Sequence, residues 1–239
     1  KFRYSSRMKF VLITGANRGI GFELTKQCLS LGHTVIATMR STLKNELFST
    51  LPNSQNLILE TLDVNSCESV STLFSKVRSY NLKIDWIFNN AGIIDWSSIH
   101  EVDAESFRDI YETNVIGAFR VLRGAIKVMN GNNNSLIINL SSRLGSIHLR
   151  GETQLGGAIA YQCSKASLNM LTKQASIDLA EHGIKVISVS PGWVRTDMGG
   201  SDAKYEVEES VKLLLAQINQ LPKNSNGIFL GEDGNEIPW

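Results

Sequence analysis

The 239 residues include 24 Lys and Arg against 23 Asp and Glu, and 42% of them are hydrophobic. A chain of this length can bury a full core as one α/β domain, and its balanced charge gives no reason to expect nucleic acid or an anionic membrane as a partner. No apolar run approaches the ~20 residues of a membrane-spanning helix, and residues 1–7 (KFRYSSR) lack the apolar region of a signal peptide. We expect a cytoplasmic protein in which residues 8–239 form one domain and residues 1–7 are a tail or tag remnant.

The cysteines and histidines predict neither disulfides nor a metal site. Cys28, Cys67 and Cys163 are odd in number and widely spaced, which is typical of reduced, mostly buried thiols in a cytosolic protein. The four histidines show no metal-ligand spacing, and no Gly-x-Ser-x-Gly motif occurs. We therefore expect neither a metal centre nor a serine-hydrolase triad.

The first strand is predicted over residues 8–14 (MKFVLIT), a short apolar run. A glycine turn, residues 15–21 (GANRGIG), follows at once, and residues 22–31 then carry apolar side chains at helical spacing. Strand, glycine turn and helix form the first half of a mononucleotide-binding unit, in which glycines let the backbone approach a pyrophosphate at the helix N-terminus.

The rest of the chain alternates between predicted strands and helices. Strands are predicted over residues 34–38, 57–62, 84–88, 136–140, 184–190 and 227–230. Helices are predicted over residues 66–80, about 104–129, from Tyr161 to about Glu181, and 207–218. This alternation predicts an α/β Rossmann fold, with a doubly wound parallel sheet of seven strands and helices on both faces.

Unusual residues follow almost every predicted strand, at the edge where this fold binds its ligands. They are Gly15, Arg40, Asp63, Asn90, Ser142 and Pro191 in chain order. Because the carboxyl ends of parallel strands share one edge of the sheet, these positions predict a single active site.

Tyr161 and Lys165 are four positions apart on a predicted helix, so their side chains share one face. A phenol with a pKa of about 10 is a poor proton shuttle at neutral pH, and a nearby cation lowers that pKa. Taken alone, such a pair is more often solvated surface than a catalytic site.

The end of the second strand predicts NADPH rather than NADH as cofactor. An NAD site normally places Asp or Glu there, where the carboxylate binds the ribose hydroxyls. The position falls at Met39, with Arg40 next, and no acid occurs between Gly32 and Glu46. Arg40 can bind a 2′-phosphate with its guanidinium fork, and Arg18 can reach it from the glycine turn.

Together these motifs resemble the short-chain dehydrogenase/reductase family from residue 8 to the end. Residues 14–21 resemble its cofactor turn, residues 89–92 (NNAG) its sheet-stabilising motif, and residues 191–196 (PGWVRT) its nicotinamide loop. Residues 141–147 and 191–200 resemble the sniffer and C-factor carbonyl-reductase branch within it.

The resemblance implies a catalytic tetrad of Asn114, Ser142, Tyr161 and Lys165. In these roles Tyr161 donates a proton, Lys165 lowers its pKa and holds the ribose, Ser142 binds the carbonyl oxygen, and Asn114 fixes a water. Taken singly, Ser142 is more often a cap and Asn114 a polar kink in a helix. The implied cofactor-binding residues are Gly15, Asn17, Arg18, Gly19, Ile20, Gly21, Arg40, Asp63, Val64, Asn90, Ala91, Gly92, Tyr161, Lys165, Pro191, Gly192, Val194 and Thr196.

The chain departs from the usual family pattern between Ser142 and Tyr161, which are nineteen positions apart. We place the surplus in residues 150–157 (RGETQLGG), where a longer loop can lie over a substrate without moving either catalytic residue. Apolar side chains beside the motifs form either a substrate pocket or part of the core: Ile94, Trp96, Leu144, Trp193, Met198 and Tyr205.

Two functions follow from the sequence. The first is an NADPH-dependent oxidoreductase that reduces the carbonyl of a small ketone, aldehyde or quinone by hydride transfer, with Tyr161 as proton donor and a homodimer as a candidate assembly. The second is a non-catalytic NADP(H)-binding protein with a signalling or redox-sensing role, since a fold does not imply an activity. The intact tetrad favours the enzyme, because a sensor does not need the phenol.

Overall fold

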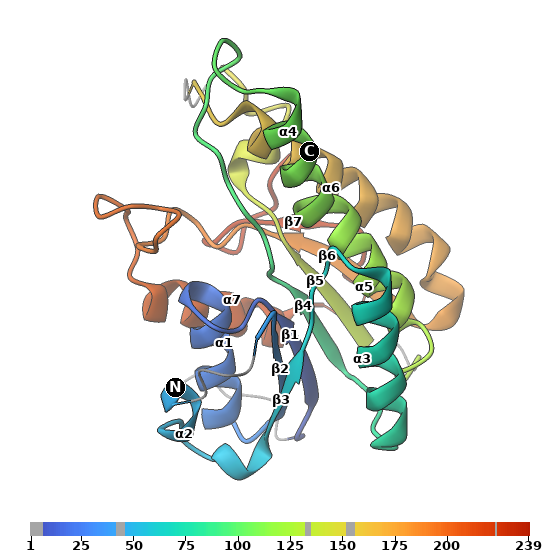
Figure 1. The fold of residues 1–239 in the computed structure, drawn as a ribbon. Helices are drawn as coiled ribbons and strands as arrows, with labels where there is room; N and C mark the ends of the chain where they lie inside the picture. Colours follow the sequence, from blue (N-terminus) through green and yellow to red (C-terminus); the bar gives the residue numbers. More distant parts are fainter. Residues whose placement is uncertain (1–6, 42–45, 132–134, 152–155, 223) are drawn as a thin grey trace.

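The computed structural model describes residues 7–41, 46–131, 135–151, 156–222 and 224–239. Within them, seven parallel strands form one sheet in the order β3-β2-β1-β4-β5-β6-β7 (Figure 1). This arrangement confirms the predicted doubly wound parallel sheet. The strands are β1 (Phe10–Thr14), β2 (Thr34–Met39), β3 (Leu57–Thr61), β4 (Trp86–Asn89), β5 (Ser135–Leu140), β6 (Ile184–Val189) and β7 (Phe229–Leu230).

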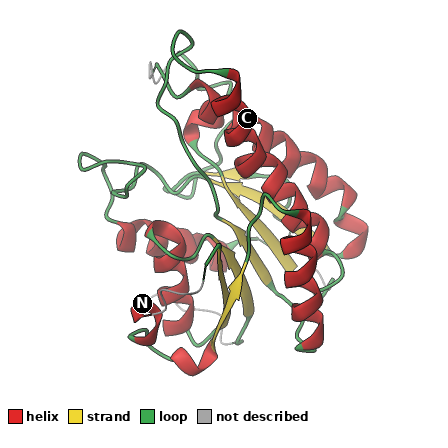
Figure 2. Ribbon diagram, viewed as in Figure 1, coloured by secondary structure: helices red, strands yellow, loops and turns green. Residues whose placement is uncertain are grey.

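Helices cover both faces of the sheet (Figure 2). One face packs against α1 (Gly19–Ser30), α2 (Glu46–Ser49) and α7 (Val207–Gln220). The other face packs against α3 (Cys67–Ser79), α5 (Ala118–Ala125) and α6 (Ile159–Asp178), with α4 (Ala104–Tyr111) lying against α6. Val11, Leu12 and Ile13 in β1 are all fully buried, because each face of this central strand is covered by helices.

The direction of strand order reverses between β1 and β4, the two strands at the centre of the sheet. Crossovers lead away from this point in opposite directions, which leaves a crevice beyond the carboxyl ends of these two strands. Gly15 follows β1 and Asn90 follows β4, so two of the predicted site segments lie at the crevice.

The prediction of one helix over residues 104–129 is wrong. A π-helical segment, Glu112–Gly117, separates α4 from α5, and α5 ends at Ala125. The wider turn sets Asn114 in a buried position, where its side chain bonds the main chain of Ile93. A Cβ added to Gly117 would lie 2.8 Å from Val64 Cγ2, so this turn also packs closely against the loop after β3. Single π-turns of this kind are frequent at functional sites.

The sequence does not predict the short helical elements of the structure, because they are too short to show a periodic pattern of apolar residues. They are α2 and three 3₁₀ segments, Ser54–Asn56, Arg143–Gly145 and Ala180–His182. The expectation of mostly buried thiols is wrong for Cys67, which is exposed, whereas Cys28 is buried. Residues 1–6 and 152–155, which include most of the predicted tail and part of the predicted extra loop, lie outside the described residues. Among the described helices, none has both the length and the apolar composition needed to cross a bilayer.

His33 is buried at the end of the sheet opposite the predicted site. Its ring packs edge-on against Trp86, with centroids 5.7 Å apart, and neither ring nitrogen has a hydrogen-bond partner within the described part of the chain. Burial lowers the pKa of His33 to about 4; nearby Lys9 acts in the same direction and Asp85 opposes it. The native state therefore excludes a proton that the unfolded chain binds readily.

This proton linkage predicts acid sensitivity that His33→Phe removes. Below pH 6.5 the unfolded chain protonates this histidine while the folded chain does not, so stability falls as pH decreases towards 4. Between pH 7 and pH 5 the wild type should lose about 2 kcal/mol more unfolding free energy than His33→Phe, measured by urea denaturation. His100→Phe, at an exposed position, serves as control. Equal losses in wild type and His33→Phe would contradict this account.

Candidate active site

The glycine turn after β1 has a backbone that other residues would not adopt. Gly15 and Gly19 have φ angles of +65° and +52°, in the left-handed region that favours glycine. A Cβ on Gly21 would lie 2.3 Å from the carbonyl oxygen of Gly15. No side chain among the described residues caps the N-terminus of α1. This cradle of close backbone and open helix N–H groups fits the pyrophosphate of a dinucleotide.

Asn90 holds the glycine turn in place. Its Nδ2 donates to the carbonyl oxygens of Thr14 and Gly15, at 2.9 and 3.1 Å. In return, Thr14 Oγ1 accepts from the backbone N–H groups of Asn90 and Ala91, each at 3.0 Å. These bonds join β1 to β4 across the crevice, so Asn90, expected to bind the cofactor, shapes the cradle with its side chain.

The segments after β2 and β3 border the other end of the crevice. Arg40 is exposed directly after β2, whereas Met39 is 4% exposed and belongs to the core. Asp63 accepts a hydrogen bond from the backbone N–H of Asn65 at 3.0 Å, and Val64 packs against the π-helical turn. Arg40 is therefore the side chain that reaches solvent next to Met39, which occupies the position where an NAD site carries its carboxylate.

The loop after β6 folds over the glycine turn. Arg18 Nη1 lies 2.6 Å from Asp197 Oδ2, and both side chains are largely exposed. Thr196 approaches the same turn, since a Cβ on Gly19 would lie 3.4 Å from Thr196 Cγ2. The loop is anchored by Val194, which is buried and pairs with Tyr205. The pairing of Arg18 with Asp197, across 179 positions, was not foreseen.

Ser142, Tyr161 and Lys165 come together at the carboxyl end of β5. The Ser142 hydroxyl is hydrogen-bonded to the Tyr161 phenol and also accepts from the backbone N–H of Leu144 at 3.2 Å. Lys165 Nζ lies 5.4 Å from the centroid of the Tyr161 ring and donates to the carbonyl oxygen of Leu140 at 2.7 Å. Tyr161 and Lys165, paired by their spacing, and Ser142, implied by the resemblance, thus form one group, in which Tyr161 and Lys165 are buried and Ser142 is half-buried.

Burial dominates the electrostatics of this group. It raises the pKa of Tyr161 to about 12, which the hydrogen bond with Ser142 only partly offsets, and it lowers the pKa of Lys165 to about 8. Loss of hydration therefore disfavours the phenolate in this group, and the predicted lowering of the phenol pKa by Lys165 stays a prediction. A phenol with this pKa is protonated at neutral pH, and it releases its proton only where a nearby positive charge stabilises the phenolate.

Asn114 supports the group from the π-helical turn. Its Oδ1 accepts from the backbone N–H of Ile93 at 2.8 Å, and its Nδ2 donates to Ile93 O and Ser164 Oγ at 2.9 and 3.0 Å. A Cβ on Gly92 would lie 3.2 Å from Asn114 Oδ1 and 3.7 Å from Lys165 Nζ. Asn114 therefore borders Lys165 across Gly92, with its side-chain atoms bonded to the protein; the predicted water stays a prediction.

Two hydrogen bonds that sequence reasoning missed fix α6 against β5. Asn139 Nδ2 donates to Thr172 Oγ1 at 2.8 Å, and Ser141 Oγ donates to Asn169 Oδ1 at 2.7 Å. Thr172 Oγ1 also lies 2.8 Å from Ser188 Oγ in β6. A signal for these bonds was present in the sequence. Asn139 and Ser141 are two apart at the end of an apolar strand, so they point to the same face, and Asn169 and Thr172 are three apart on one face of a helix.

Of the six apolar residues beside the motifs, Tyr205 pairs with Val194, and the other five lie in segments that leave the same edge of the sheet. Trp96 and Trp193 are 51% and 55% exposed, which is unusual for such large apolar side chains. The Trp96 carbonyl accepts from the N–H of Ala158, so its loop is fastened to the start of α6. The other members, Ile94, Leu144 and Met198, are half-buried.

Comparison with known proteins places this arrangement in a family. The family model for short chain dehydrogenases matches residues 9–206. The chain belongs to the short-chain dehydrogenase family. The predicted cofactor turn, tetrad and nicotinamide loop all fall within the matched residues.

Individual short-chain dehydrogenases resemble the chain over most of its length. NADPH-bound carbonyl reductase from chicken fatty liver is 33% identical, with a TM-score of 0.90 over 98% of this chain and 100% of that one. Carbonyl reductase Sniffer of D. melanogaster is 31% identical, with the same TM-score and coverage. C-signal of Myxococcus xanthus is 34% identical over 65% of this chain and 93% of that protein. These relatives confirm the expected resemblance to the sniffer and C-factor branch.

The α6 contacts predict that Thr172→Val destabilises the protein despite its equal volume. The change leaves the buried Asn139 amide without its acceptor, which costs about 1–3 kcal/mol. Urea denaturation at pH 7 measures the loss, with Thr72→Val on the exposed face of α3 as matched control. A Thr172→Val protein as stable as the control would mean that this hydrogen bond does not hold α6 in place.

Proposed function

We propose that this chain reduces the carbonyl group of a ketone, aldehyde or quinone with NADPH, and that Tyr161 donates the proton. The observation that carries the proposal is the hydrogen bond between the half-buried Ser142 and the buried Tyr161, with Lys165 beside the phenol ring. The group lies at the carboxyl edge of the sheet, next to a backbone cradle suited to a dinucleotide.

The cofactor is NADP(H), as in the NADPH-bound chicken relative. The glycine turn would hold its pyrophosphate, and the exposed Arg40 and Arg18 would bind the 2′-phosphate. Lys165 would hold the ribose, and residues 191–196 the nicotinamide. Bound at this edge, NADPH would supply the hydride for reduction of the carbonyl.

Side chains of this protein would supply the proton and stabilise the negative charge that forms on the carbonyl oxygen. Ser142 hydrogen-bonds the carbonyl oxygen and Tyr161 transfers its phenolic proton to that oxygen, so the carbonyl gains one hydride and one proton and becomes an alcohol. A buried phenolate is costly, as the raised pKa of Tyr161 shows, and the adjacent Lys165 ammonium stabilises it during transfer. A proton from solvent then restores the phenol, leaving the group as it began.

We infer that the substrate carbonyl has apolar or aromatic flanks. An anionic substrate would need a clamp of several cations. Arg143 is bound by Glu232 and Asp233, and Arg195 is paired with Glu206, so both are engaged within the protein. The exposed rings of Trp96 and Trp193 offer apolar surface instead.

Replacement of the phenol tests the proposed mechanism. Tyr161→Phe removes one hydroxyl and keeps the ring, so turnover should fall by about 10²–10⁴ while NADPH affinity stays nearly unchanged. Lys165→Ala should reduce both, because the ammonium serves the phenol and the ribose. The measurements are NADPH oxidation with a panel of aromatic ketones, quinones, aldehydes and one keto acid, and NADPH binding by fluorescence.

The panel also separates the competing interpretations. A Tyr161→Phe rate above about a tenth of wild type would assign the proton to another residue. The keto acid as best substrate would contradict the apolar pocket. NADPH binding without turnover of any carbonyl would favour the non-catalytic role.

The cofactor assignment predicts that Arg40→Ala weakens NADPH and spares NADH. Loss of one charge-assisted contact to the 2′-phosphate is worth roughly 1.5–3 kcal/mol, or about one to two decades of affinity. Substitution at Arg40 is preferable to a carboxylate at position 39, because Met39 is buried in the core. Dissociation constants for both cofactors measure the effect, and Arg123→Ala on the exposed side of α5 is the control. Equal weakening of both cofactors would show that Arg40 does not bind the phosphate.

A further inference from the structure

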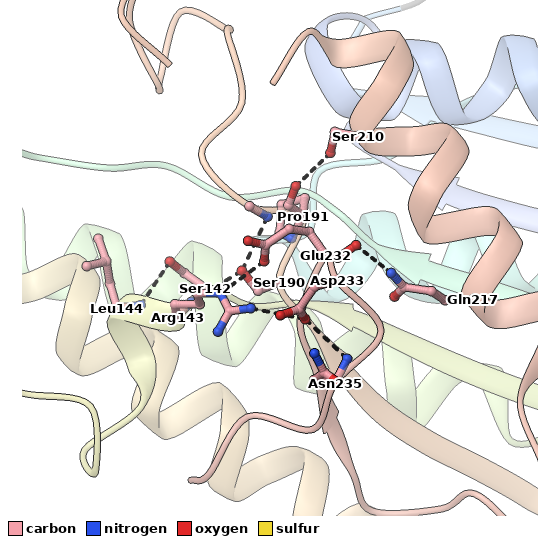
Figure 3. A network of polar contacts seen from close by, with 11 residues as sticks. Ser142, Arg143, Leu144, Ser190, Pro191, Ser210, Gln217, Glu232, Asp233 and Asn235 are labelled. Carbon is pink, nitrogen blue, oxygen red and sulfur yellow. Dashed lines mark hydrogen bonds and ion pairs between the residues drawn. The ribbon is translucent and has the colours of Figure 1, made fainter. Parts of the chain in front are cut away.

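Arg143 directly follows the catalytic Ser142 and is held on three sides (Figure 3). Its Nε donates to Glu232 Oε2 at 3.0 Å, and its Nη2 lies 3.2 Å from Asp233 Oδ1. Its backbone N–H donates to Ser190 Oγ at 3.3 Å. A guanidinium between two carboxylates is confined in direction as well as position, because its donors form a rigid plane.

Glu232 is itself anchored. Its side chain is 13% exposed, and its backbone oxygen accepts from Gln217 Nε2 of α7 at 2.5 Å. The turn around it is tight, since a Cβ on Gly231 would lie 2.4 Å from Arg143 Nη2. The pair therefore links the segment after β5 to the segment after β7, and through it to α7.

Glu232 also lies against the loop after β6. A Cβ on Gly192 would be 3.1 Å from Glu232 Cγ. The Ser190 hydroxyl that accepts from Arg143 accepts from the Gly192 N–H as well, at 3.4 Å, and the Pro191 carbonyl accepts from Ser210 Oγ at 2.7 Å. Arg143, Glu232 and Ser190 thus connect the peptide after Ser142 with the start of the loop that folds over the glycine turn.

We propose that Arg143, held by Glu232, is a positioning residue that fixes the Ser142 hydroxyl relative to the loop of residues 191–196. This inference rests on the proposed function, in which Ser142 contacts the carbonyl oxygen and that loop holds the nicotinamide. The ion pair fixes the distances between the segments that follow β5, β6 and β7. It thereby determines where the substrate's carbonyl carbon lies relative to the nicotinamide when Ser142 binds the carbonyl oxygen.

Two variants test the role from opposite sides of the pair. Arg143→Met keeps most of the apolar stem and removes the guanidinium, and Glu232→Gln keeps the shape and removes the charge. Both should lower kcat by about tenfold or more, since a displacement of about 1 Å can cost ~10²-fold in rate. The dissociation constant of NADPH should stay within about threefold, because the binding contacts remain. Arg143→Lys, which keeps the charge without the fork, should recover part of kcat.

Hydrogen exchange of the protein without cofactor gives a readout that does not depend on activity. Amides in residues 141–149 and 190–200 should exchange faster in both variants, while those of β1 and α1 stay unchanged. Arg108→Met, which removes an exposed arginine–glutamate pair on α4, is the control and should match wild type in every measurement.

Each alternative outcome is decisive. Unchanged kcat and unchanged exchange in Glu232→Gln overturn the proposal, and this variant decides the matter if Arg143→Met does not fold. Faster exchange throughout the chain with unchanged kcat assigns the pair a purely structural role and also overturns it. If the wild type reduces no carbonyl, the proposed function fails, and the local exchange of the two segments still tests the positioning claim.

Discussion

The site depends on the register of α6 against the end of β5. Ser142 is the second residue after β5, whereas Tyr161 and Lys165 lie on α6, so nothing in the local sequence sets their separation. The buried bonds from Asn139 to Thr172 and from Ser141 to Asn169 do so. A slip of one residue along a helix moves a side chain by about 1.5 Å and turns it by roughly 100°. Such a slip would take the phenol away from the serine, so the proposed chemistry depends on these two bonds.

Burial gives this group its chemical character. The same exclusion of water raises the pKa of Tyr161 and lowers that of Lys165. A neutral phenol therefore lies beside an ammonium group that loses its proton more easily than a free lysine does. In a site of low polarity the ammonium acts strongly on any negative charge that forms nearby. In the proposed mechanism the phenol remains protonated at rest and gives up its proton as the carbonyl oxygen becomes negative.

Sequence reasoning identified what local spacing encodes. Each signal lies within one element or turn. The signals are the glycines between a strand and a helix, the four-residue separation of Tyr161 and Lys165, and the missing acid after β2. The fold followed from alternating periodicities, which the sheet confirms. Contacts between residues far apart in the sequence could not be predicted: Arg143 bonds Glu232 across 89 positions, and Asn114 in the π-turn bonds Ile93 across 21 positions. Neither has a periodic signal.

The central claim is that this buried group directs hydride transfer to a carbonyl carbon. Incubation with NADPH deuterated at the transferable nicotinamide position and an aromatic ketone tests it most directly, with the alcohol product examined by mass spectrometry and NMR. The account predicts one deuterium per product molecule, at the carbinol carbon, formed by wild type and lost in Tyr161→Phe. An alcohol without deuterium, or NADPH consumed with no alcohol formed, would contradict it.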